Sequence, residues 1–139
     1  MNKAHDFRTV IHQYLLDLGF TKKKENYLLN FPEIMIVIGI QKSRYSNGYY
    51  INLGYIVTES GLSNDLPRAI DGEIRTRFSI ETEGKDNDLF ELKTLSKDIL
   101  IASLQLNIDK YVSGICNIET IQMLLKRYPV LLYQTSLKA

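Results

Sequence analysis

The sequence predicts an α+β fold: an N-terminal helix, a four-stranded antiparallel meander sheet, and C-terminal helices packed on one sheet face. Both ends of the chain repeat apolar residues at three- and four-residue spacing, which is typical of amphipathic helices. The middle instead alternates apolar and polar residues or runs through β-branched ones, with turn residues in between. Because 139 residues is an ordinary domain size, we expect a single domain over residues 1–139.

A single apolar stripe predicts the first helix. Its members are Phe7, Val10, Ile11, Tyr14, Leu15 and Leu18. Gly19 follows at the position of a left-handed helix cap, and Phe20 can fold back onto the last turn. Residues 21–26 are polar and charged, which predicts a solvated turn.

Four segments are predicted as strands: residues 27–31, 34–41, 49–57 and 73–80. The second is apolar on both faces, as in a central strand. Asn47 and Gly48 tolerate positive φ, so they predict the hairpin that leads into the third strand. Alternation in that strand predicts that Leu53 faces the core and Asn52 does not. Residues 58–71 and 81–88 are predicted to be loops.

Helices are predicted for the last third of the chain. A polar residue within 86–88 can cap a helix that begins near Leu89. The apolar pattern that follows fits one long helix or two, and Gly114 ends it. Asn117 is a good cap for a final helix, which should stop before Pro129.

Charge and composition narrow the classes of function. Seventeen Lys and Arg residues against 16 Asp and Glu give a net charge of +1, which is not the strongly basic footprint of a duplex nucleic-acid binder. Cys116 is the only cysteine, so no internal disulfide can form. The longest apolar run, Ile34–Ile38, is too short to span a bilayer. With no apolar leader after Met1, these features predict a cytoplasmic protein without a membrane partner.

Four segments carry a resemblance to a known family: Gly19-Phe20-Thr21-Lys22-Lys23, Gln41-Lys42-Ser43-Arg44-Tyr45, Tyr50-Ile51-Asn52-Leu53-Gly54 and Ile74-Arg75-Thr76-Arg77. In order and rough spacing they resemble the bacterial domain-of-unknown-function family 4304 over almost the whole chain. The resemblance implies a compact α+β domain and no established activity. Related small domains lie near polymorphic toxin loci, which by association suggests an immunity-like, toxin-neutralising role. A Cys-His pair often precedes the last segment in the family, whereas this chain has Gly72-Glu73, so no metal or thiol role is carried over.

Catalytic and metal-binding patterns are missing from the sequence. His5 and His12 lie about two helical turns apart, and a zinc site needs more ligands than these two. Cys116 has no histidine nearby in the sequence to activate it. The carboxylates within residues 81–91 are expected to be solvated at a loop and a helix start. No phosphate-binding loop or dinucleotide fingerprint is present. We therefore expect no metal, no cofactor and no catalytic residues.

A basic and aromatic surface is the one functional signal. Its candidate residues are Arg75, Arg77, Tyr50, Asn52, Lys42, Arg44 and Tyr45. Arg75 and Arg77 should project about 7 Å apart from one strand face, and Tyr50 and Asn52 belong to the polar face of their strand. If the helices cover the other sheet face, these four share an open one, where Met35 and Val37 supply an apolar floor.

Two interpretations of this surface stay open. Tyrosine and arginine are enriched at protein interfaces, so the surface can bind a protein partner such as a toxin domain. Alternatively, the arginines pair with Glu73 and its neighbours on a solvated face, as exposed antiparallel sheets commonly do. We therefore predict a non-catalytic protein-interaction module. Binding of single-stranded nucleic acid or of an anionic small ligand by the same face is the alternative.

Overall fold

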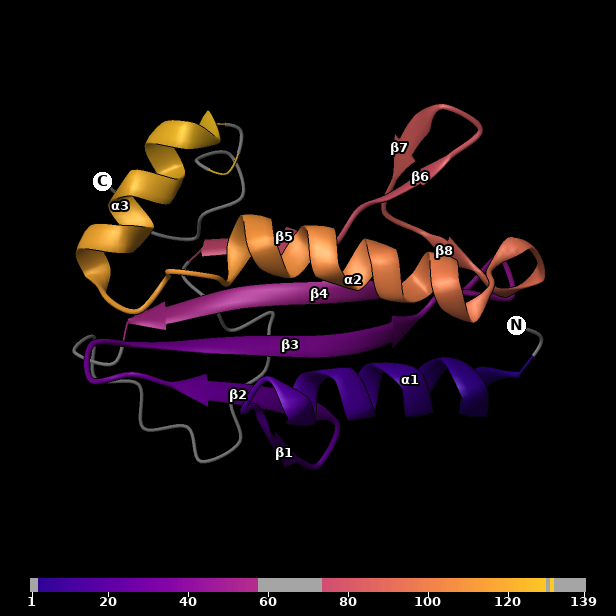
Figure 1. The fold of residues 1–139 in the computed structure, drawn as a ribbon, viewed down its shortest axis with the longest axis horizontal. Coiled ribbons are helices and arrows are strands. Elements are labelled where there is room, and N and C mark those ends of the chain that lie inside the picture. Colours follow the sequence, from indigo (N-terminus) through magenta and orange to yellow (C-terminus); the bar gives the residue numbers. More distant parts are fainter. Residues whose placement is uncertain (1–2, 58–73, 130, 132–139) are drawn as a thin grey trace.

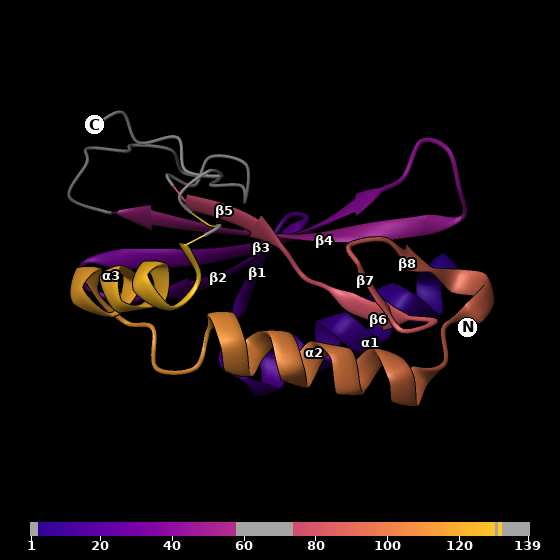
Figure 2. The same cartoon turned by 90° about the horizontal axis from the view of Figure 1, so that it is seen from above.

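The computed structural model describes residues 3–57, 74–129 and 131. Within these ranges the elements are α1 (Ala4–Asp17), β1 (Thr21–Lys23), β2 (Asn26–Asn30), β3 (Ile34–Lys42), β4 (Gly48–Val57), β5 (Ile74–Arg77), β6 (Ile80–Thr82), β7 (Lys85–Asn87), β8 (Phe90–Glu91), a 3-10 turn (Leu92–Thr94), α2 (Lys97–Tyr111) and α3 (Ile118–Arg127). All three helices lie on the same side of the main sheet, which confirms the predicted α+β layers (Figures 1 and 2).

The main sheet is antiparallel, with strand order β1-β2-β3-β4-β5. The predicted four-stranded meander corresponds to β2 through β5. Two short strands extend it: β1 pairs with β2, and β8 pairs with β4 beyond the end of β5. The expected solvated turn at residues 21–26 was therefore wrong in part. The three residues of β1 are all exposed, so they lack the apolar alternation by which a strand is recognised in sequence.

The core lies between this sheet and the helices. Cross-strand neighbours such as Ile38 and Leu53 point toward the helices, and both are fully buried. Phe7, Ile11 and Leu15 of α1 pack against the same cluster. Leu53 faces the core and Asn52 the opposite side, as predicted.

A left-handed cap ends α1, as predicted. The Gly19 N–H donates to the Leu16 carbonyl at 3.0 Å and the Phe20 N–H to the Leu15 carbonyl at 3.1 Å. Gly19 has a φ of +99°, and Phe20 is buried against the core. Leu18 does not complete the predicted stripe. It lies at the end of the helix and stays 44% exposed.

The β3–β4 hairpin differs in detail from the prediction. Its loop spans residues 43–47 and is closed by a bond from the Ser43 N–H to the Gly48 carbonyl at 3.0 Å. Gly48 does not have positive φ. The space around it requires glycine instead, because a Cβ there would lie 3.0 Å from both the Leu89 side chain and the Phe90 carbonyl oxygen.

The fifth strand is shorter than predicted, because helix α2 binds the backbone that follows it. The Asn107 side-chain amide accepts from the Ser79 N–H at 2.9 Å and donates to the Ser79 carbonyl at 2.7 Å. The Ser103 hydroxyl also donates to that carbonyl, at 2.9 Å. The chain therefore leaves the main sheet and forms the separate β6–β7 hairpin, which projects from the body (Figure 1).

The predicted helix start near Leu89 was wrong. Phe90 and Leu92 are both buried, a two-residue spacing that suits the extended chain of β8 and the turn after it. Helix α2 begins at Lys97, where the Ser96 hydroxyl caps the Ile99 N–H at 3.2 Å.

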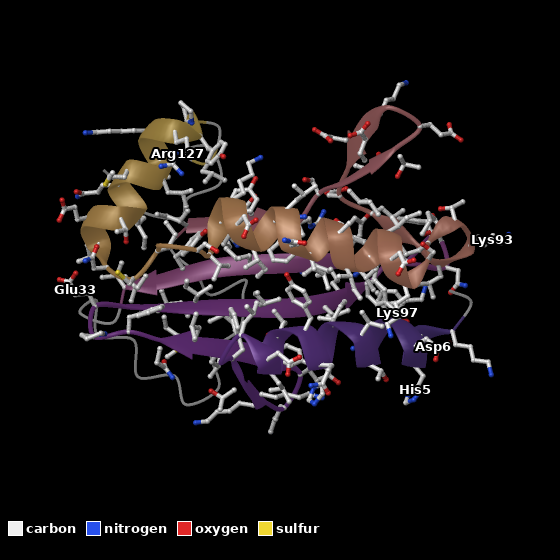
Figure 3. The ribbon with its side chains drawn as sticks, in the orientation of Figure 1. His5, Asp6, Glu33, Lys93, Lys97 and Arg127 are labelled. Atoms are coloured by element: carbon white, nitrogen blue, oxygen red, sulfur yellow. The ribbon has the colours of Figure 1, made fainter. Side chains whose placement is uncertain are left out.

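The predicted Asn117 cap is confirmed. Asn117 and Thr120 form a reciprocal capping box at the start of α3, which ends at Arg127, before Pro129. The Glu33 carboxylate, from the β2–β3 turn, also accepts from the Ile118 N–H at 3.1 Å and lies beside this helix end (Figure 3). The predicted loop at 58–71 and the Gly72-Glu73 position fall outside the described residues.

Candidate functional site

The sheet face away from the helices brings together the central residues of the predicted surface. Asn52 of β4 lies opposite Arg77 of β5, and Gly54 lies opposite Arg75. Tyr50 is two residues from Asn52 on the same face and lies opposite Gln41 of β3. We call this region the sheet face; it is defined by Gln41, Tyr50, Asn52, Arg75, Arg77 and Asp88.

Arg77 is the most highly connected residue of the sheet face. Its guanidinium carbon lies 3.9 Å from the centroid of the Tyr50 ring. Its Nε donates to Asn52 Oδ1 at 3.0 Å, and its Nη1 donates to Asp88 Oδ2 at 3.1 Å. The Asn52 amide in turn donates to Gln41 Oε1 at 2.9 Å, and Arg77 Nη2 lies 3.5 Å from the same oxygen.

These contacts fix the plane and the position of the Arg77 guanidinium. The Arg77 and Asp88 side chains are 39% and 52% exposed, so their ion pair is solvated and contributes at most about 1 kcal/mol to stability. Its larger effect is geometric. A stacked and hydrogen-bonded arginine loses little side-chain entropy when it binds a partner.

A hollow of about 570 Å³ adjoins this network. Its lining residues are Gln41, Asn52, Leu53, Arg75, Thr76, Arg77 and Asp88. Gly39 and Gly54 occupy neighbouring positions of the same face, and both are buried. Arg75 is exposed beside this hollow.

Apolar residues continue the same face toward β2. Leu28, Val37 and Ile56 form a buried cluster, with Met35 packed against it. The structure thus places Met35 and Val37 on the predicted side of the sheet. Val37 is fully buried and so is not part of the expected apolar floor, whereas Met35 is partly exposed.

The hairpin residues are separate from this group. The Lys42 ammonium donates to the carbonyls of Ser43 and Ser46 and lies 5.6 Å from the Tyr49 ring, on the helix side of the sheet. Arg44 is exposed, and Tyr45 is 94% exposed at the tip of the loop. Lys42, Arg44 and Tyr45 therefore form no part of the network around Arg77.

Sequence reasoning missed Gln41 and Asp88. Gln41 had a usable signal, since counting outward from the β3–β4 hairpin places it beside Tyr50. Asp88 had none, because its position depends on how the β6–β7 hairpin leaves the sheet and returns to β8.

Within the described ranges, no three His, Cys, Asp or Glu side chains gather closely enough to hold a metal ion. Cys116 is exposed, and its backbone N–H donates to the Thr120 hydroxyl at 2.9 Å. His12 is half-buried and hydrogen-bonded to Tyr27. No helix in the described part of the chain is long and apolar enough to cross a membrane.

Comparison with known proteins gives one positive result. The family model described as Domain of unknown function (DUF4304) matches residues 11–117, which include all of β1 to β8 and α2. No curated protein and no solved structure matches the chain. Since the matched segment is well over half of the sequence, the chain belongs to the DUF4304 family.

Proposed function

We propose that this domain is a non-catalytic, cytoplasmic protein-interaction module and that the sheet face is its binding surface. The observation that carries the proposal is the guanidinium of Arg77, stacked on Tyr50 and held by Asn52 and Asp88. Arginine and tyrosine dominate the energetics of many protein interfaces, most of all where they are rigid before binding.

The charges of the sheet face favour a partner with carboxylates of its own. Arg75 and Arg77 line the same hollow together with one carboxylate, that of Asp88. A partner carboxylate can therefore bind at this pair of arginines, and the Arg77–Tyr50 pair provides a flat contact beside it. An immunity-like role, in which the partner is a toxin domain, is the specific form suggested by the family resemblance.

The contact between Arg77 and the Tyr50 ring also favours a protein partner over single-stranded nucleic acid. Bases bind such proteins by stacking on open aromatic rings. One side of the Tyr50 ring is covered by Arg77, which reduces its use as a platform. A net charge of +1 adds little general attraction to phosphate chains.

The test is capture of a partner from the native host, identification of that partner, and titration of purified variants. We expect Arg75→Ala and Arg77→Ala each to weaken binding by about 2 kcal/mol, roughly thirtyfold. Arg44→Ala is the matched control, because it removes the same charge from the exposed hairpin loop. Equal affinity of all three variants and the wild type would exclude the sheet face. Affinity for single-stranded nucleic acid that falls steeply with salt would favour the alternative function.

A further inference from the structure

On the opposite side of the sheet, a second hollow is lined by helix α1 and the β1–β2 hairpin. Its volume is about 570 Å³, and its lining residues are His5, Arg8, Thr9, His12, Lys22, Glu25, Tyr27 and Ile40. We propose that this helix-side hollow binds the phosphate group of a small phosphate monoester. The proposal concerns a different ligand class and a different surface from the sheet face, and it does not depend on the function proposed above.

Helix periodicity creates one wall of this hollow. His5, Arg8, Thr9 and His12 lie three and four residues apart, so they share one side of α1. Figure 3 shows His5 pointing away from α2, on the free side of the helix. These polar residues lie next to Phe7, Ile11 and Leu15, the side of α1 that packs into the core. Their side chains therefore lie at the edge of the contact between α1 and the sheet.

Strand register creates the facing wall. Lys22 of β1 lies opposite Tyr27 of β2, and Tyr27 opposite Ile38 of β3, so all three point toward the helices. His12 Nδ1 is hydrogen-bonded to the Tyr27 hydroxyl at 2.9 Å, which fixes the orientation of the imidazole. The other ring nitrogen, Nε2, has no hydrogen-bond partner among the described residues.

Among the described residues, the cations of the helix-side hollow form no ion pair. Neither Arg8 nor Lys22 has a carboxylate within 4 Å in the described part of the chain, unlike Arg77, which pairs with Asp88. Both instead lie over aromatic rings, Arg8 at 5.3 Å from Tyr49 and Lys22 at 5.9 Å from Tyr27. Such rings position a cation without neutralising it.

The balance of charge favours an anion. Two cations line the hollow against the single carboxylate of Glu25, and two imidazoles add hydrogen-bonding nitrogens. Burial raises the pKa of the Tyr27 phenol, with Arg8 acting in the opposite direction, so this hydroxyl remains a neutral hydrogen-bonding group. Arginine suits two-point contact with phosphate oxygens, and lysine adds a point charge.

The remaining lining explains why a small ester fits better than phosphate alone. Ile40 is partly exposed and provides apolar surface, and the volume lies within the range of small-molecule sites, about 300–1,000 Å³. An aromatic or aliphatic group carried by the phosphate has a wall to pack against.

Phenyl phosphate is a suitable probe, titrated at constant ionic strength and followed by calorimetry and by amide NMR shifts. Inorganic phosphate tests the contribution of the ring, and benzenesulfonate tests the need for a dianion. We expect saturable binding of phenyl phosphate, tighter than for either control compound, with shifts centred on Thr9, His12 and Tyr27.

Three variants test the assignment. Arg8→Gln and Lys22→Gln should each weaken phenyl phosphate binding at least tenfold. Lys23→Gln is the control, because it removes the same charge one residue along β1, from the opposite side of the sheet. Unchanged melting temperatures establish that the variants are folded, and Arg77→Ala should bind the probe like the wild type. The proposal is overturned by absence of saturable binding, by equal losses in the Lys22 and Lys23 variants, or by shifts that map to the sheet face.

Discussion

Arg77 and Tyr50 are diagonal neighbours across β4 and β5, and the guanidinium carbon lies 3.9 Å from the ring centroid. In an antiparallel sheet such diagonal pairs are within reach of long side chains and contribute to stability in their own right. The pair is therefore part of the fold as well as the centre of the proposed interface.

The first prediction measures that coupling. A double-mutant cycle of Arg77→Ala and Tyr50→Leu should give an interaction energy of about 0.5–1 kcal/mol in urea unfolding. Each single change should cost little, because the guanidinium is partly exposed. Arg75→Ala combined with Tyr50→Leu is the control and should be additive. An interaction energy near zero in the Arg77 cycle would mean that the contact between Arg77 and Tyr50 does not contribute to the free energy of unfolding.

A second prediction concerns the two faces of β4. Leu53→Ala should destabilise the fold by about 2–5 kcal/mol, since Leu53 is fully buried. Asn52→Ala should cost about 1 kcal/mol, because it loses half-exposed hydrogen bonds to Arg77 and Gln41. Denaturant midpoints of the two variants provide the comparison. The reverse order of stability would contradict the register.

Substitution of Gly19 and substitution of Gly48 should each destabilise the fold, but for different reasons. Gly19→Ala should cost about 1 kcal/mol because of its positive φ, although space around it is open. Gly48→Ala should cost about 1–3 kcal/mol through the short contacts with Leu89 and Phe90. Asparagine separates the two mechanisms, since it tolerates positive φ better than alanine. Gly19→Asn should recover part of the loss in thermal melts, whereas Gly48→Asn should be no better than Gly48→Ala.

The buried phenol of Tyr55 should make the stability of the fold depend on pH above pH 10. Burial raises the pKa of Tyr55 far above its ordinary value of 10.0, with a smaller effect of Tyr111 in the same direction. The unfolded chain therefore loses this proton first. The stability contributed by Tyr55 is complete below pH 10 and decreases as the pH rises beyond it.

Tyr55→Phe tests this dependence. The variant should lose about 1–3 kcal/mol at neutral pH, because the Tyr111 carbonyl loses the hydroxyl that donates to it. Its unfolding free energy should then fall less steeply than that of the wild type above pH 10, as measured by urea titrations at several pH values. Parallel curves for the two proteins would show that Tyr55 ionises normally.

The sequence was sufficient where one residue type decides a local conformation. The Gly19 and Asn117 caps and the alternation at Leu53 were all predicted correctly, because each depends on near neighbours along the chain. The grouping of Tyr50, Asn52, Arg75 and Arg77 followed from the same alternation. The predictions failed where distant segments decide the outcome. Neither the pairing of β8 with β4 nor the position of Asp88 can be inferred from local pattern.

The bend at Ser79 connects the two sides of the sheet. Asn107 is buried in α2, yet by binding the Ser79 backbone it sets where the chain departs toward the hairpin that delivers Asp88 to Arg77. A substitution at Asn107 would thus disturb a surface that this residue never touches. If such a variant bound the partner more weakly, the cause would be a displaced Asp88 carboxylate and not a lost contact with Asn107. Mapping an interface on this domain by mutational scanning will therefore produce false positives inside α2 unless the position of Asp88 is monitored at the same time.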